Sequence, residues 1–189
     1  MSSRTIIYGI PIKKAQNSAD KYCKKTPGDE TSVGQGEVSL VMKGTFQVAG
    51  SPGNRNFTSN FAASPETGGS YSIKCKHWDG NGNYAMIGKV RPGAYLEFIQ
   101  RYPDKNVTRL YTASNAETVR QKGSLKIIYR GQWEELGGSS SGTFAFELRN
   151  RLSGNQTLSE DQFEEHRSIY SEQRGGLGGL FSALLGFCV

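Results

Sequence analysis

The chain has 189 residues and a formal charge of +6, with 24 Gly, 9 Tyr and 9 Phe. This length fits one domain that buries roughly 70% of its unfolded surface, so the core requires no disulfide or metal. Aromatic residues scattered among many glycines favour short strands and tight turns, and they argue against long helices.

Residues 1–36 predict an N-terminal arm. The apolar run at 5–12 could pair as an edge strand or dock on a neighbouring subunit. The lysine-rich segment that follows has no sustained period and ends in a Pro27-Gly28 turn signal. The apolar run is too short and interrupted for a signal peptide, so we expect a cytoplasmic protein with possible membrane association.

Residues 37–150 predict a β-domain of eight short runs bounded by turn residues. Asp79-Gly80-Asn81-Gly82 is a strong hairpin signal, and residues 114–123 are expected to form a longer polar loop. The short connections favour an all-β fold, an eight-stranded antiparallel up-and-down barrel; a two-sheet sandwich is the alternative. The predicted strands are 38–48, 57–63, 71–78, 83–90, 94–102, 107–113, 124–133 and 143–148.

Residues 151–175 predict a linker and an amphipathic helix. Ser159 and Gln162 match a capping box, and acidic residues open the segment 160–174. Gly175 and Gly176 would end the helix.

Residues 176–189 form a hydrophobic Gly/Leu/Phe tail without charged side chains. Its large residues recur at helical spacing, but about fourteen residues are too few to span a bilayer. The tail could plug the barrel or cap a neighbouring subunit, associate with a membrane, or remain disordered and prone to aggregation. In composition it resembles membrane-active peptides such as viral fusion peptides. The predicted membrane- or partner-binding residues are Leu177, Leu180, Phe181, Leu184, Leu185 and Phe187.

No catalytic signature, metal site or cofactor motif is found in the sequence. Neither a GxSxG elbow nor a phosphate-binding GxxxxGK[ST] loop occurs, and the three cysteines form no CxxC pair. The two histidines, His77 and His166, are interpreted as structural or surface residues. We therefore predict no catalytic residue, no metal and no cofactor.

Nucleic-acid binding is considered and disfavoured, although not excluded. Basic and aromatic residues interleave along several predicted strands, a mixture that OB-folds use to stack bases. A basic all-β domain presents the same mixture by chance. The residues concerned are Lys74, Lys76, Arg91, Arg101 and Arg109 with Tyr71, Trp78, Tyr84 and Tyr102.

The spacing of glycines and aromatic residues between residues 37 and 150 resembles that of a known fold family. They are Asp79-Gly80-x-Gly82-x-Tyr84-x-x-x-Gly88, Phe98-x-x-x-Tyr102, Tyr129-x-Gly131-x-Trp133 and Gly142-x-Phe144. This order resembles calycin-type small barrels, and in particular uncharacterised barrel modules of fungal, plant and protist proteins. The resemblance implies a closed barrel with an internal cavity. Gly44-Thr45-Phe46 stands where lipocalins have Gly-x-Trp, and residues 124–148 lack the histidine of nitrobindin-like haem barrels.

The leading functional hypothesis is a non-enzymatic binding or interaction barrel whose tail engages a membrane or an apolar partner site. Membrane lipid or a small apolar ligand is the expected partner. One alternative is a self-assembling shell, capsid or filament subunit that exchanges its arm and tail as a homo-oligomer. Another is a small enzyme such as an isomerase, using Glu97, Tyr129 and His77. Alternation predicts that the ligand-binding interior comprises Phe46, Phe61, Tyr71, Ile73, Met86, Phe98, Tyr111, Ile127, Tyr129 and Phe144.

Overall fold

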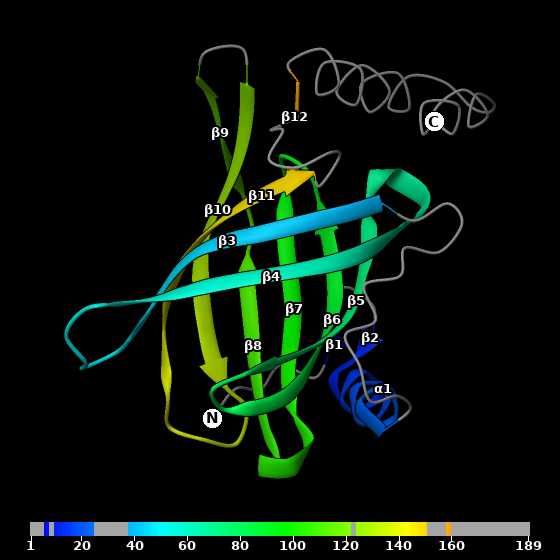
Figure 1. Ribbon diagram of the computed structural model, residues 1–189, viewed down its shortest axis with the longest axis vertical. Coiled ribbons are helices and arrows are strands. Elements are labelled where there is room, and N and C mark those ends of the chain that lie inside the picture. The colour runs from blue at the N-terminus through cyan, green and yellow to red at the C-terminus, as the bar shows by residue number, and fades with distance from the viewer. Residues whose placement is uncertain (1–5, 8–9, 25–37, 122–123, 151–157, 160–189) are drawn as a thin grey trace.

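Eight strands close into an antiparallel barrel in the computed structural model, which describes residues 6–7, 10–24, 38–121, 124–150 and 158–159 (Figure 1). The barrel closes because β11 pairs with β10 on one side and with β3 on the other. This confirms the predicted up-and-down barrel and excludes an open sandwich. Its strands are β3 (Val38–Val48), β4 (Asn54–Pro65), β5 (Tyr71–Asp79), β6 (Gly82–Arg91), β7 (Tyr95–Tyr102), β8 (Val107–Ala113), β10 (Ser124–Glu135) and β11 (Ser141–Asn150).

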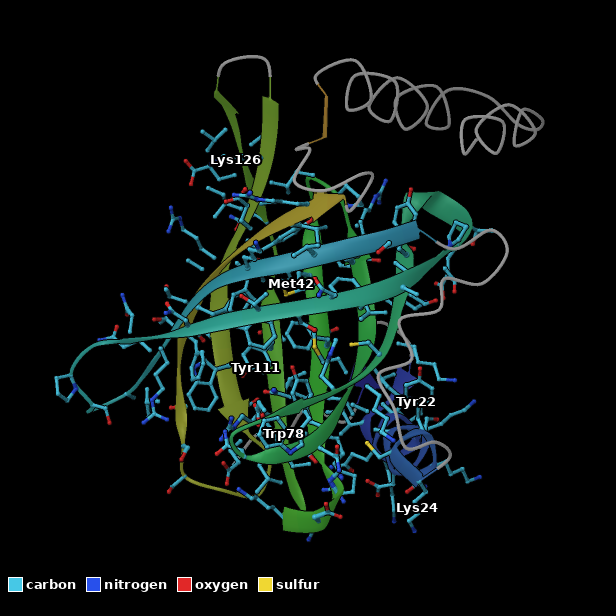
Figure 2. All side chains as sticks on the ribbon, in the orientation of Figure 1. Tyr22, Lys24, Met42, Trp78, Tyr111 and Lys126 are labelled. Atoms are coloured by element: carbon cyan, nitrogen blue, oxygen red, sulfur yellow. The ribbon has the colours of Figure 1, made fainter. Side chains whose placement is uncertain are left out.

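Aromatic side chains fill the middle of the barrel. Phe98 of β7 stacks on Tyr111 of β8 with centroids 4.6 Å apart, and these two residues are direct cross-strand partners. Phe146 stacks on Phe57 and on Phe144 at 4.7 and 4.5 Å. Figure 2 shows the side chains gathered inside the barrel, with the fully buried Met42 and Tyr111 among them. Such offset stacks add to the stability gained from buried apolar area.

Two glycines allow neighbouring strands to approach closely within this packed wall. A Cβ atom at Gly88 would overlap the backbone of Glu97 and Phe98 on β7. A Cβ atom at Gly131 would overlap the carbonyl group of Thr112 on β8. At these two positions glycine is required because any side chain would overlap the neighbouring strand.

A helix, α1 (Ile12–Lys24), packs on the outer wall of the barrel, whereas the sequence analysis expected an irregular lysine-rich arm. Its apolar face is narrow: Ile12, Ala15 and Ala19 are buried, and the rest of the helix is largely polar. Ile12 and Ala15 pack with Ile99 of β7 and Leu110 of β8. Ile12, Ala15 and Ala19 recur at helical spacing, but the segment is mostly polar and two of these three residues are small alanines, and the helix was therefore missed. Lys21 and Lys24 lie in its last turn, where the helix dipole favours cations.

The predicted polar loop at 114–123 is wrong over most of its length, because β9 (Ala116–Gln121) pairs with the first half of β10. This β9–β10 hairpin projects beyond the barrel in Figure 1. Its exposed residues Glu117 and Thr118 face solvent, so the strand lacks the apolar alternation that marks the other strands.

The remaining elements are short. The strands β1 (Ile6–Ile7) and β2 (Ile10–Pro11) pair with each other, and β12 (Leu158–Ser159) pairs with the start of β10. Two 3-10 turns, η1 (Thr67–Gly69) and η2 (Pro103–Lys105), connect β4 to β5 and β7 to β8. The predicted helix at 160–174 and the tail at 176–189 lie outside the described residues.

Candidate functional site

The barrel wall separates between β4 and β5. Only four residue pairs join these strands, from Ala62–Lys74 to Pro65–Tyr71. The first half of β4 continues its ladder with β3, from Asn54 onwards, while the second half of β5 stays paired with β6. The ring Nε2 of His77 bonds to the carbonyl oxygen of Asn60 across the separation. Beyond this bridge the two strands diverge.

A cleft of about 280 Å³ lies where the strands diverge, and we name it the β4–β5 cleft. The separated half of β4 forms one side and the β5–β6 turn another, while side chains of β3, β6, β7 and β8 form the remaining wall. It is lined by Phe46, Arg55, Asn56, Phe57, Thr58, Asp79, Gly80, Asn81, Tyr84, Gln100, Tyr102 and Arg109.

A chain of three hydrogen bonds runs from the barrel core to the rim of this cleft. The Tyr111 hydroxyl donates to Gln100 Oε1 at 3.1 Å, and Gln100 Nε2 donates to the Tyr102 hydroxyl at 2.8 Å. The Tyr102 hydroxyl then donates to Asp79 Oδ2 at 2.7 Å. The other carboxylate oxygen of Asp79 accepts from the backbone N–H of Asn81 at 2.7 Å. Both oxygens of Asp79 therefore have a donor within the fold.

Arg109 contributes a guanidinium group at the inner side of the cleft. Its Cζ lies 5.5 Å from the ring centroid of Tyr102 and 5.7 Å from that of Trp133. These are cation–π distances. Among the described residues Arg109 forms no ion pair, and its buried Nε has no hydrogen-bond partner. The cleft thus holds a positive charge that the described fold does not neutralise.

The tyrosines around the cleft are held in their neutral form. Burial raises the pKa of Tyr102, and its hydrogen bond to Asp79 raises that pKa further. Burial also raises the pKa of Tyr84, and it raises the pKa of Tyr111 to about 12 against a lowering effect of Arg109. At neutral pH these hydroxyls therefore act as hydrogen-bond partners and not as tyrosinate bases.

The ten predicted interior residues all belong to the aromatic and aliphatic cluster inside the barrel. Eight of them are buried, while Phe46 and Tyr71 are partly buried against the cluster. Only Phe46 of the ten lines the β4–β5 cleft. Binding of a ligand by the other nine remains a prediction, and the predicted tail residues 177–187 lie outside the described residues.

The sequence analysis did not assign the polar residues of the cleft. Arg109 precedes Tyr111 by two positions, so the alternation that placed Tyr111 inside also places Arg109 inside. The same step from Phe98 leads to Gln100 and Tyr102. The alternation thus indicated that these polar residues face inward. No sequence pattern, however, reveals where β4 and β5 separate.

The three residues of the enzyme hypothesis do not meet. Glu97 alternates with the inward-facing Leu96 and Phe98, so it faces outward beside Lys89 of β6 and Thr112 of β8. The Tyr129 hydroxyl donates to the carbonyl oxygen of Arg91 at 3.0 Å. His77 contacts Asn60 instead.

The basic and aromatic residues of the nucleic-acid hypothesis are divided between the two faces of the wall. Tyr84, Tyr102 and Arg109 line the cleft, whereas Lys74 lies over the ring of Tyr22 on the outer helix. Arg101 pairs with Asp20 of α1. The described structure therefore does not collect these residues into one groove.

Comparisons with known proteins add little to this geometry. No protein-family model matches the chain, and no curated protein sequence matches it. A crystal structure of the ywiB protein from Bacillus subtilis is similar with a TM-score of 0.34 and 7% identity, over 61% of this chain and 92% of that chain. Within the described ranges no helix has the length and apolar character needed to cross a bilayer. The same ranges contain no group of His, Cys, Asp or Glu side chains arranged to hold a metal ion.

Proposed function

We propose that the protein is a non-enzymatic binding barrel that holds a small ligand in the β4–β5 cleft. The main support for this proposal is that the β4–β5 ladder ends at the pair Ala62–Lys74. Beyond this pair the wall has an opening lined by polar and aromatic side chains. Small-molecule sites combine an apolar wall with a few placed polar groups, at volumes from about 300 Å³. The cleft has this combination of apolar and polar groups, and its volume of about 280 Å³ lies just below that range.

The chemistry of the cleft favours binding over catalysis. A general base at neutral pH needs a proton affinity near that pH, and the raised pKa values of Tyr84 and Tyr102 remove these hydroxyls from that role. Asp79 accepts two hydrogen bonds that orient it within the turn. These groups are suited to fixing the position of a ligand.

A fluorescence titration with the neutral probe phenylnaphthylamine tests the proposal on the full chain. We expect saturable binding that Thr58→Trp weakens at least about tenfold, a difference of about 1.4 kcal/mol. Thr58 is exposed and lines the cleft, so a large side chain there obstructs the opening. Thr118→Trp is the matched control, because Thr118 is exposed on β9. Equal affinities for both variants and the wild type would reject the cleft as the binding site.

We also propose that the tail at 176–189 engages a membrane surface. The support is the helical spacing of Leu180, Leu184 and the other large residues, together with a basic and aromatic outer surface. On that surface Trp78 is 70% exposed at the end of β5, with exposed Lys74 on the same strand and exposed Lys24 on α1 (Figure 2). Tryptophan and lysine together suit the interface of an anionic bilayer.

A further inference from the structure

We propose that the β4–β5 cleft selects an anion, a compact acid with a flat apolar body whose carboxylate pairs with Arg109. This inference rests on the proposed binding function of the cleft. It specifies the charge and the shape of the ligand, and it assigns Arg109 as the residue that binds the anionic group.

Arg109 is directed towards the inside of the barrel. Along β8 the outward residues contact α1 or pack beneath it: Thr108 accepts a hydrogen bond from Gln16 at 2.9 Å, and Leu110 packs with Ile12. Arg109 alternates with these two residues, and its guanidinium lies over the interior rings of Tyr102 and Trp133. The side chain thus points towards the inside of the barrel, where it lines the β4–β5 cleft and its Nε is buried.

Arg109 differs from the neighbouring Arg101 in its partners. Arg101 contacts both carboxylate oxygens of Asp20, at 2.9 and 3.3 Å, and also bonds to Asn106 and Thr108. Arg109 has no such carboxylate among the described residues, and its Nε is buried without a partner. A partly buried charge without a counter-charge costs free energy, and an arriving anion would lower that cost. Arginine is also the side chain best shaped to hold a carboxylate through two parallel hydrogen bonds.

The wall of the cleft carries a net positive charge. Its charged residues are Arg55, Arg109 and Asp79, which gives 2 − 1 = +1. Asp79 already accepts hydrogen bonds from Tyr102 and from the backbone of Asn81. The charge of Asp79 is therefore stabilised by hydrogen bonds within the fold, whereas the charge of Arg109 meets aromatic rings and no carboxylate among the described residues. The balance favours an anionic ligand over a cationic one.

The aromatic lining of the cleft favours a ligand with a flat body. Phe46, Phe57 and Tyr84 present aromatic surface to the cleft, and rings favour a flat partner that can stack on them. The cleft volume of about 280 Å³ suits a compact molecule. An aromatic carboxylate or sulfonate combines these properties.

The test uses two probes with the same aromatic skeleton, anilinonaphthalene sulfonate, which is anionic, and phenylnaphthylamine, which is neutral. Fluorescence titrations of the full chain are compared for the wild type and Arg109→Gln, which removes the charge and leaves a shorter, polar side chain. We expect the affinity for the sulfonate to fall at least about tenfold and that for the neutral probe to change less than about twofold. Arg130→Gln, at an exposed site on β10, is the matched control and should alter neither affinity.

A competition experiment on the wild type does not depend on the folding of any variant. Benzoate is expected to displace phenylnaphthylamine from the cleft, and benzamide, which has the same shape without the charge, is expected to displace it at least about tenfold less well. Equal displacement by the two competitors, or an equal loss of both probes in Arg109→Gln, would overturn anion selection and leave the binding site in place. If Thr58→Trp bound phenylnaphthylamine as tightly as the wild type, the cleft itself would be rejected as the binding site.

Discussion

The Tyr102 hydroxyl donates a hydrogen bond of 2.7 Å to Asp79 Oδ2, which connects the end of β7 to the turn between β5 and β6. Tyr102 is 2% exposed, so this bond forms where competing water is scarce. It fixes the turn that forms one side of the β4–β5 cleft. The same hydroxyl accepts from Gln100, which extends the connection to Tyr111 in the core.

Tyr102→Phe is expected to lower the free energy of unfolding by about 1–2 kcal/mol, because Asp79 and Gln100 each lose a buried partner. Urea denaturation measures the change. Tyr71→Phe is the matched control: Tyr71 belongs to the same interior cluster, and its hydroxyl has no hydrogen bond among the described residues. We expect the control to change stability by less than about 0.5 kcal/mol. Similar losses for both variants would show that the Tyr102–Asp79 bond contributes nothing specific.

Gly88→Ala is expected to destabilise the barrel by more than about 2 kcal/mol, since the new methyl group would overlap the backbone of Glu97 and Phe98. Thermal denaturation followed by circular dichroism measures this. Gly80→Ala provides the control, because no atom lies within 4 Å of a Cβ placed there. If the Gly88 variant melts at the same temperature as the Gly80 variant, the close approach of β6 to β7 is not as described.

Asp20→Asn is expected to cost about 1–3 kcal/mol and to increase hydrogen exchange in α1. Arg101 would lose its counter-charge, and its side chain is only 11% exposed. The 30% exposure of the Asp20 side chain places the cost below that of a fully buried pair. Glu117→Gln is the control, because it breaks the pair with Arg130, whose side chains are 54% and 63% exposed. Such exposed pairs contribute about 0–1 kcal/mol. An equal effect of both changes would mean that Asp20 does not hold α1 on the barrel.

Stability is expected to fall in alkaline solution as a result of the buried tyrosines. The pKa of Tyr111 is raised from 10.0 to about 12, so the unfolded chain releases this proton at a lower pH than the folded barrel does. The contribution of Tyr111 is therefore complete below about pH 10 and is lost as the pH rises towards 12, by about 1.4 kcal/mol per pH unit. Urea unfolding between these pH values measures the slope. Tyr111→Phe should reduce that slope, and an unchanged slope would contradict the assignment.

Deletion of residues 176–189 is expected to abolish co-sedimentation with anionic liposomes and to leave the melting temperature unchanged. The large side chains of the tail each contribute about 1.5–3 kcal/mol when buried, which suits reversible attachment. Leu180→Glu combined with Leu184→Glu should reproduce the deletion. A drop of several degrees on deletion, without lipid binding by the intact chain, would instead identify the tail as a plug of the barrel. Light scattering of the same samples tests the self-assembling alternative, which requires oligomers that the deletion disrupts.

Eight short runs with short connections predicted the barrel, and alternation along single strands predicted its interior. Phe98, Tyr111 and Phe144 were assigned to the interior by their spacing, and the structure buries all three. The elements that were missed contain few large apolar side chains. In α1 the buried residues include the small Ala15 and Ala19. In β9 the polar residues reflect a hairpin that extends beyond the barrel.

The sequence by itself determined which side chains face inward, because successive residues of a strand point to opposite faces wherever the strand lies. The same rule already placed Arg109 on the inner face with Tyr111. Only the tertiary structure decided that the part of β4 before Ala62 is not paired with β5, since strand separation depends on the pairing of both strands with β3 and β6. That separation is what brings Arg55 of β4, Asp79 of the β5–β6 hairpin and Arg109 of β8 to a single opening. These residues are far apart in sequence, and local periodicity carries no information about distances between strands.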